Sequence, residues 1–214
     1  MRWRFKNARS WIIACLLCLG FWQLGHGAYI PAKAWVAQGL MLHAWGRATR
    51  GEASPAPWPW ADTWPIARLR ARGGKVDLIV LAGGSGRTLA FGPGHLSASV
   101  MPGQRGNSVI AGHRDTHFNF LKDLAIGEKL QVETADGRGH TYRVVDLDVV
   151  DARRGSLLLD TDESVLSLVT CYPFDAVAAG GPMRYVVTLS LLRDSVVGSA
   201  GRATVRAWMR QKRD

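Results

Sequence analysis

The feature that most constrains the fold is a series of short apolar runs in which hydrophobic and polar residues alternate, with glycine-rich segments between them. Alternation with a period of two is typical of β-strands that bury one face. The runs predict strands over residues 76–81, 88–91, 108–111, 129–134, 142–150, 165–170 and 184–192. The pair Asp136-Gly137 is a hairpin signal, and one helical turn is expected to end at Gly127. Many short strands with little helix predict a sandwich or a closed barrel of about 120 residues.

The N-terminus predicts a membrane anchor. A basic segment, residues 1–9, precedes an apolar stretch over residues 11–24 that is as short as the core of a signal peptide. With its polar continuation it reaches the ~20 residues that span a bilayer. Residues 25–27 resemble a cleavage site, but Trp22 suits a membrane interface, so we favour an uncleaved signal anchor over residues 10–30. The basic segment would then stay in the cytoplasm and the rest would be exported.

Residues 31–75 are expected to connect this anchor to the strand-rich part. Apolar groups at helical spacing predict an amphipathic helix over residues 31–50. Residues 51–69 are rich in proline and tryptophan, so we expect neither helix nor central strand there. The tryptophans would pack on the body or lie at the membrane.

The charge distribution argues against nucleic-acid binding. The formal net charge is +10, but the excess lies at the basic N-terminus and in a basic tail over residues 194–214. No basic stripe interleaved with aromatic residues runs through the remaining sequence, as a surface that follows a phosphate backbone would require.

Three polar side chains stand at the ends of apolar strands: His113, Cys171 and Arg184. A thiol needs a base or a cationic neighbour to act as a nucleophile. Histidine can supply the base and later protonate a leaving amine, and arginine offers charged donors to an oxyanion. The three residues form a complete set for acyl transfer if the fold brings them together.

Each residue also has a purely structural alternative. Cysteine is among the most buried residue types, so Cys171 could be a core residue, and His113 could hydrogen-bond a turn. Arg184 could pair with Asp175 or Asp162.

Two other kinds of chemistry are weaker alternatives. His113, Asp115 and His117 carry metal-ligand groups, but they lack an obvious fourth ligand, and we predict no metal site. Ser85 faintly resembles a nucleophile elbow, but the required G-x-S-x-G is absent and no helix is expected after it.

The segments "GNSVIAGHRDTHFNFLKDLAIGEKL", "LSLVTCYPF" and "GPMRYVV" resemble the His, Cys and Arg motifs of sortases, in the family's chain order. The resemblance covers about residues 78–192, and the connector "PWPWADTWPIARL" is similar to the Gram-negative subgroup called class GN. It implies an all-β fold: a closed, mostly antiparallel eight-stranded β-barrel with short helices, here the catalytic domain over residues 76–193.

By this resemblance, Cys171 is the nucleophile that forms a thioacyl-enzyme. His113 is the general acid and then the base, and Arg184 binds the substrate and stabilises the oxyanion. His117 comes too late in the motif to take the histidine role. Thr170, Tyr172 and His95 are expected to line the substrate site.

The resemblance further implies a membrane-anchored cysteine transpeptidase that cleaves an LPXTG-like C-terminal sorting signal between Thr and Gly. The substrate would be one dedicated secreted protein, the location the periplasmic side of the inner membrane, and no cofactor is expected. The acceptor amine stays open: a peptidoglycan cross-bridge, a pilin-like lysine or water. The alternatives are a catalytically silent, membrane-tethered barrel that binds a peptide, and a cysteine peptidase that only hydrolyses.

Overall fold

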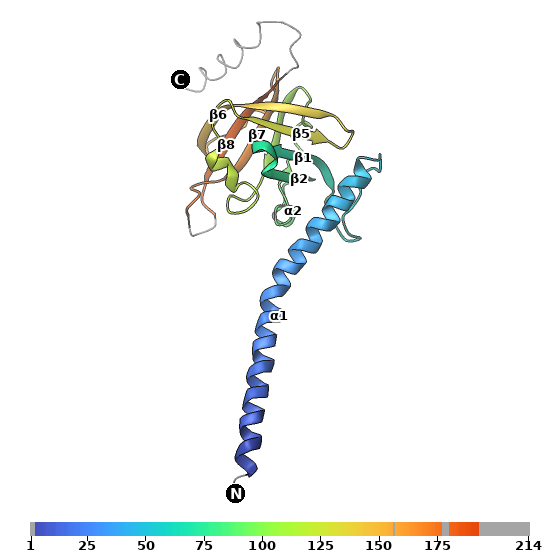
Figure 1. The fold of residues 1–214 in the computed structure, drawn as a ribbon. Helices are drawn as coiled ribbons and strands as arrows, with labels where there is room; N and C mark the ends of the chain where they lie inside the picture. Colours follow the sequence, from blue (N-terminus) through green and yellow to red (C-terminus); the bar gives the residue numbers. More distant parts are fainter. Residues whose placement is uncertain (1–2, 156, 177–179, 193–214) are drawn as a thin grey trace.

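The computed structural model describes residues 3–155, 157–176 and 180–192, and the tail predicted over residues 194–214 lies outside this part (Figure 1). A long N-terminal helix leads to a β-barrel (Figure 1). The elements are α1 Trp3–Ala48, β1 Pro65–Ala71, η1 Arg72–Gly74, β2 Val76–Ala82, α2 Gly86–Leu89, β3 Gly94–His95, β4 Gly106–Ala111, η2 Asn119–Asp123, β5 Lys129–Thr134, β6 Gly139–Asp151, β7 Ser164–Cys171 and β8 Met183–Leu191.

The strands close into a barrel in the order β1-β2-β3-β4-β7-β8-β6-β5. The pairs β2–β3 and β4–β7 are parallel, and the other neighbours are antiparallel. Over the described residues the barrel has eight strands, which confirms the predicted closed, mostly antiparallel architecture. Closure leaves no edge strand open to pairing with another chain.

The strand predicted over residues 88–91 is wrong. This segment begins in the short helix α2, and the hydroxyl of Ser85 caps that helix by accepting a hydrogen bond from the Thr88 amide at 3.2 Å. The expectation that no helix follows Ser85 is wrong for the same reason. Thr88 is the buried residue of this helical turn, so its burial does not reflect the alternation of a strand.

Strand β1 also departs from the expectation, because it pairs with β2 on one side and β5 on the other. Pro65 is its first residue, a position where a missing N–H costs little. Arg68 forms a two-pronged ion pair with Asp77 of β2, both hydrogen bonds being 2.6 Å long. The barrel therefore includes residues 65–75, which were expected to belong to the connector.

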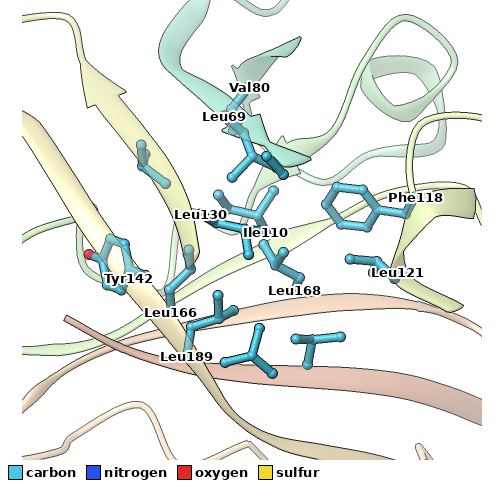
Figure 2. Packing of buried hydrophobic residues seen from close by; sticks show 14 of the residues in the cluster. Leu69, Val80, Ile110, Phe118, Leu121, Leu130, Tyr142, Leu166, Leu168 and Leu189 are labelled. Carbon is cyan, nitrogen blue, oxygen red and sulfur yellow. The ribbon is translucent and has the colours of Figure 1, made fainter. Parts of the chain in front are cut away.

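The barrel core is formed by one cluster of aliphatic and aromatic side chains from seven of the strands and the η2 segment (Figure 2). Phe118 and Leu121 lie side by side at one end of it, beside Ile110 and Leu168 (Figure 2). The predicted helical turn is η2, but it ends before Leu124 rather than at Gly127, because Leu124 is extended and buried.

The last turns of α1 pack on the outside of the barrel. Met41 and Trp45 are buried against Ile79 and Leu81 of β2 in a second cluster. The helix runs from this contact away from the barrel (Figure 1). It is continuous through the regions where the sequence predicted an anchor and a separate amphipathic helix.

The connector tryptophans do not share one environment. Trp58 packs edge-to-face on Phe91, with ring centroids 4.8 Å apart, whereas Trp60 is 81% exposed. Among the residues described, no helix combines the length and the apolar character needed to cross a membrane. The structure therefore does not show the expected anchor over residues 10–30.

Candidate active site

The parallel pairing of β4 with β7 brings His113 and Cys171 to the same end of the barrel. Ala111 is the register partner of Val169, and the Gly112 amide donates to the Val169 carbonyl at 3.1 Å. Because the strands run in the same direction, the residues that follow each of them leave the barrel together. Extending the register places position 113 beside position 171.

Strand β8 adds Arg184 on the other side of the cysteine. Cys171 and Arg184 are direct register partners in the antiparallel pair β7–β8. Opposed residues of this kind have Cβ atoms about 4.5–5.5 Å apart on the same face of the sheet. Cys171 is a free thiol and is half-buried, His113 is exposed and Arg184 is half-buried. All three side chains are therefore placed at one accessible end of the barrel.

The Arg184 guanidinium is held by the backbone that precedes it. Its Nη1 donates to the carbonyl oxygens of Gly181 at 2.7 Å and Met183 at 2.9 Å. Asp162, one of the two carboxylates considered as its partner, instead pairs with Arg105. The guanidinium is thus oriented by carbonyl groups at the entrance to β8.

The segment after His113 folds back onto the strand. The Phe118 amide donates to the His113 carbonyl at 2.9 Å. The Phe118 ring lies so close to Gly112 that a Cβ at that position would be 2.8 Å from Phe118 Cγ. Only glycine fits there without displacing the ring. Packing of Phe118 in the core therefore fixes the backbone on which His113 is placed.

His117 lies near the candidate histidine and is half-buried. Burial, and secondarily the charge of His113, lower the pKa of His117 below its ordinary value. The second histidine is thus biased toward its neutral form, and the two imidazoles lie close enough for their charges to interact. Across the residues described, no three or more His, Cys, Asp or Glu side chains gather as a metal site requires.

The other predicted site residues have well-defined contacts. The buried Thr170 hydroxyl donates to the Gly112 carbonyl at 2.7 Å. His95 is buried, and its Nε2 lies 2.9 Å from the Val100 carbonyl oxygen and 3.1 Å from Ser99 Oγ. Its ring is therefore engaged with the turn that leads back toward the beginning of β4.

Tyr172 belongs to an aromatic cluster next to Cys171. Its ring stacks on Tyr185, with centroids 6.3 Å apart, and Phe174 meets Tyr185 edge-on at 5.3 Å. Because Tyr185 follows Arg184 directly, the cluster joins the two segments that carry the thiol and the guanidinium. Tyr172 follows Cys171 directly and is 37% exposed, so an aromatic ring is accessible at the end of β7.

The sortase-domain family model matches residues 69–192, more than half of the chain. The chain belongs to the sortase family. The matched region contains His113, Cys171 and Arg184, so the sortase domain includes the whole cluster at the barrel end.

This sortase is similar to sortase D of Bacillus subtilis (strain 168), with 34% identity over 112 residues. The match covers 52% of this chain and 56% of that protein, so it spans about half the length of the curated relative.

Solved structures share the fold of this sortase. A Clostridium perfringens sortase D5 transpeptidase gives a TM-score of 0.58 at 20% identity, covering 74% of this chain and 99% of its own. A lid mutant of Corynebacterium diphtheriae sortase A gives a TM-score of 0.56 at 21% identity, covering 79% of this chain and 97% of its own. A pilus-related sortase C of Group B Streptococcus gives a TM-score of 0.53 at 25% identity, covering 61% of this chain and 68% of its own. These relatives do not support the assignment to class GN.

Proposed function

We propose that this sortase-family protein is a cysteine transpeptidase that cleaves an LPXTG-like sorting signal between Thr and Gly and transfers the acyl group to an amine. The observation that supports this most is the meeting of three strand ends, in which Cys171 faces Arg184 in register and His113 leaves the adjacent parallel strand. A thiol, an imidazole and a guanidinium are the groups that acyl transfer needs.

The proposed reaction has two halves. In the first, the Cys171 sulfur attacks the threonine carbonyl carbon as a thiolate, the peptide C–N bond breaks, and protonated His113 donates its proton to the departing glycine amine. A thioester remains on Cys171. In the second, the acceptor amine gives a proton to His113 and attacks the thioester, and the sulfur departs as the new amide forms. The two halves together restore the Cys171 thiolate and the proton on His113.

Arg184 is proposed to bind the substrate carbonyl and stabilise the oxyanion. A guanidinium carries five N–H donors, and the contacts to Gly181 and Met183 use Nη1. The fixed Nη1 orients the plane of the group, so that its other edge can face a substrate oxygen. This arrangement lowers the cost of ordering the side chain during reaction.

Among the three residues expected to bind substrate, Tyr172 has the placement that favours this role most. Its exposed ring, supported by Tyr185, would contact a substrate side chain at the end of β7. The buried hydroxyl of Thr170 and the engaged ring of His95 instead favour roles in holding the site in shape.

We also propose class GN membership, a periplasmic location and one dedicated secreted target on the resemblance of the Pro/Trp-rich connector. Attachment to the inner membrane is proposed on the basic and apolar N-terminal segment, residues 1–24. Protease digestion of the barrel in intact and in osmotically shocked cells tests the location. Digestion only after lysis of the inner membrane would contradict it.

The function is tested by incubating the full chain with an LPXTG-type peptide library and recording intact mass. We expect a thioacyl adduct on the wild type and none on Cys171→Ala. Added amines should raise turnover if transfer is the reaction, and an unchanged turnover over a broad range of amines would favour hydrolysis. If a folded wild type forms no adduct with any peptide, the transpeptidase proposal fails and the silent peptide-binding barrel is favoured.

A further inference from the structure

A buried cation follows the candidate histidine directly. The side chain of Arg114 is only 5% exposed, whereas its neighbours His113 and Asp115 are both exposed. Removing a guanidinium from water is costly unless its N–H groups find charged or hydrogen-bonding partners. The partners of Arg114 therefore show what the fold gains from this burial.

Two of these partners belong to the segment that follows the candidate nucleophile. Arg114 Nη1 donates to the Pro173 carbonyl at 2.9 Å, and Nη2 donates to the Ala176 carbonyl at 2.7 Å. Nε donates to the adjacent Asp115 carboxylate at 3.2 Å, which balances the charge. A single side chain from the histidine segment thus holds the cysteine segment at two points.

A second cross-connection runs in the opposite direction. The hydroxyl of Thr170, the residue before Cys171, donates to the carbonyl of Gly112, the residue before His113. The two connections lie on either side of the candidate pair along the chain. Thr170 joins the strands just before the pair, and Arg114 joins the segments just after it.

We propose that Arg114 is a positioning residue that fixes His113 relative to Cys171 by joining the segments that follow them. The proposal rests on the transpeptidase function proposed above. The bonds from Arg114 to Pro173 and Ala176 go to backbone carbonyls, so its effect is exerted through the backbone.

A positioning role for Arg114 predicts that its loss slows some substrates more than others. Protonation of the leaving amine requires His113 at hydrogen-bond distance from the departing nitrogen, and a displacement of about 1 Å can cost about 100-fold in rate. A substrate whose leaving group departs without a proton, such as an activated ester of the same acyl peptide, does not need that alignment to acylate Cys171; the later attack of the amine on the thioester is common to both substrates. Loss of positioning should therefore slow the amide much more than the ester.

The experiment compares Arg114→Lys and Arg114→Met with the wild type, in the full chain, on both substrates. Lysine keeps the charge, but its compact ammonium cannot reproduce the planar fork that meets two carbonyls. Arg87→Lys and Arg87→Met are the matched controls, because Arg87 is exposed on α2 and pairs only at the surface with Asp62. All assays are run well below the thermal midpoint of each variant.

Both Arg114 variants should lose about 10- to 100-fold in the single-turnover rate of Cys171 acylation by the amide, while KM stays within about twofold and the rate of acylation by the ester within about threefold. The Arg87 variants should match the wild type on both substrates. In an Arg114→Met/His113→Gln double variant, the loss of rate on the amide should not exceed that of His113→Gln alone. Both substitutions abolish the same alignment of His113 with the leaving amine, so their effects do not add.

Equal losses on amide and ester, a change confined to KM, or no loss would overturn the positioning role. So would a failure of both Arg114 variants to fold, since the guanidinium would then be a requirement of folding itself. These results differ from a failure of the proposed function, in which the wild type forms no thioacyl adduct on Cys171 and both proposals fall.

Discussion

At the scale of single residues, Tyr142 shows how one buried polar atom makes stability depend on pH. Its ring is completely buried in the core, and its hydroxyl points away from the aliphatic cluster (Figure 2). The Gly103 amide donates to that oxygen at 2.7 Å. Burial raises the pKa of Tyr142 to about 12, because a phenolate would lose its hydration there.

The raised pKa predicts a loss of stability in alkali. From about pH 10 to about pH 12 the folded chain keeps the Tyr142 proton and the unfolded chain releases it, so the free energy of unfolding falls as pH rises. The stabilisation is fully present below about pH 10. Its loss amounts to roughly 2–3 kcal/mol, at ~1.4 kcal/mol per unit of pKa difference between the folded and the unfolded chain. Urea unfolding of the wild type and Tyr142→Phe across this range measures it. We expect the wild type to lose stability more steeply, and parallel curves would contradict the prediction.

The same scale shows what sequence can and cannot reveal about the candidate site. Cys171, His113 and Arg184 were identifiable because each is a reactive side chain at the end of an apolar run. Arg114 was not, because nothing in the sequence distinguishes it from Arg153, which is 71% exposed in a pair with Asp151. The difference between them is burial, which depends on segments distant in sequence.

At the scale of elements, alternation predicted the long strands and failed on the short ones. The predictions over residues 129–134 and 165–170 correspond to β5 and β7. Strand β5 buries every second residue, and β7 buries a continuous run. Strand β3 has only two residues, too few to show any period. Strand β1 was missed although apolar residues alternate with Arg68 and Arg70, because the prolines before it dominated the interpretation.

The contact between α1 and the barrel gives a prediction at this scale. Met41 is 1% exposed against β2, whereas its neighbour Leu42 is 50% exposed. Truncating a buried methionine to alanine costs about 2–5 kcal/mol when the contact is part of the cooperative unit. Met41→Ala should therefore lower the free energy of unfolding by that amount, and Leu42→Ala should change it by less than about 0.5 kcal/mol. Urea unfolding followed by circular dichroism measures both.

Equal and small effects of the two substitutions would contradict this prediction. Such a result would mean that the end of α1 separates from the barrel at little cost. Both changes replace one good helix former by another, so helix propensity does not explain a difference between them.

At the scale of the whole molecule, the site depends on a pairing that no local pattern contains. His113 and Cys171 are distant in the sequence, and only the parallel pairing of β4 with β7 gives their strands a common end. Chain order and strand period leave many pairings open. The closed eight-stranded barrel was predicted from family resemblance, and the order of its strands is seen only in the structure.

Closure of the barrel predicts which part of the chain can fold alone. A fragment of residues 76–192 lacks β1 and leaves the edges of β2 and β5 unpaired. It also loses the ion pair from Arg70 to Glu133 and the buried side chains of Ile66 and Leu69. A fragment of residues 62–192 keeps β1 and the bond from Thr63 Oγ1 to the Ala82 carbonyl at 2.7 Å.

We expect the longer fragment to unfold cooperatively on heating and the shorter one to show no cooperative transition. The reason is that a sheet without β1 exposes two strand edges and part of the core. No other segment of the shorter fragment is available to cover them. Thermal circular dichroism and binding of a hydrophobic dye distinguish the two states. If the shorter fragment unfolds within about 5 °C of the longer one, β1 is dispensable and the barrel's stability does not depend on closure. A high dye signal from the shorter fragment alone would locate the lost stability in the core that β1 covers.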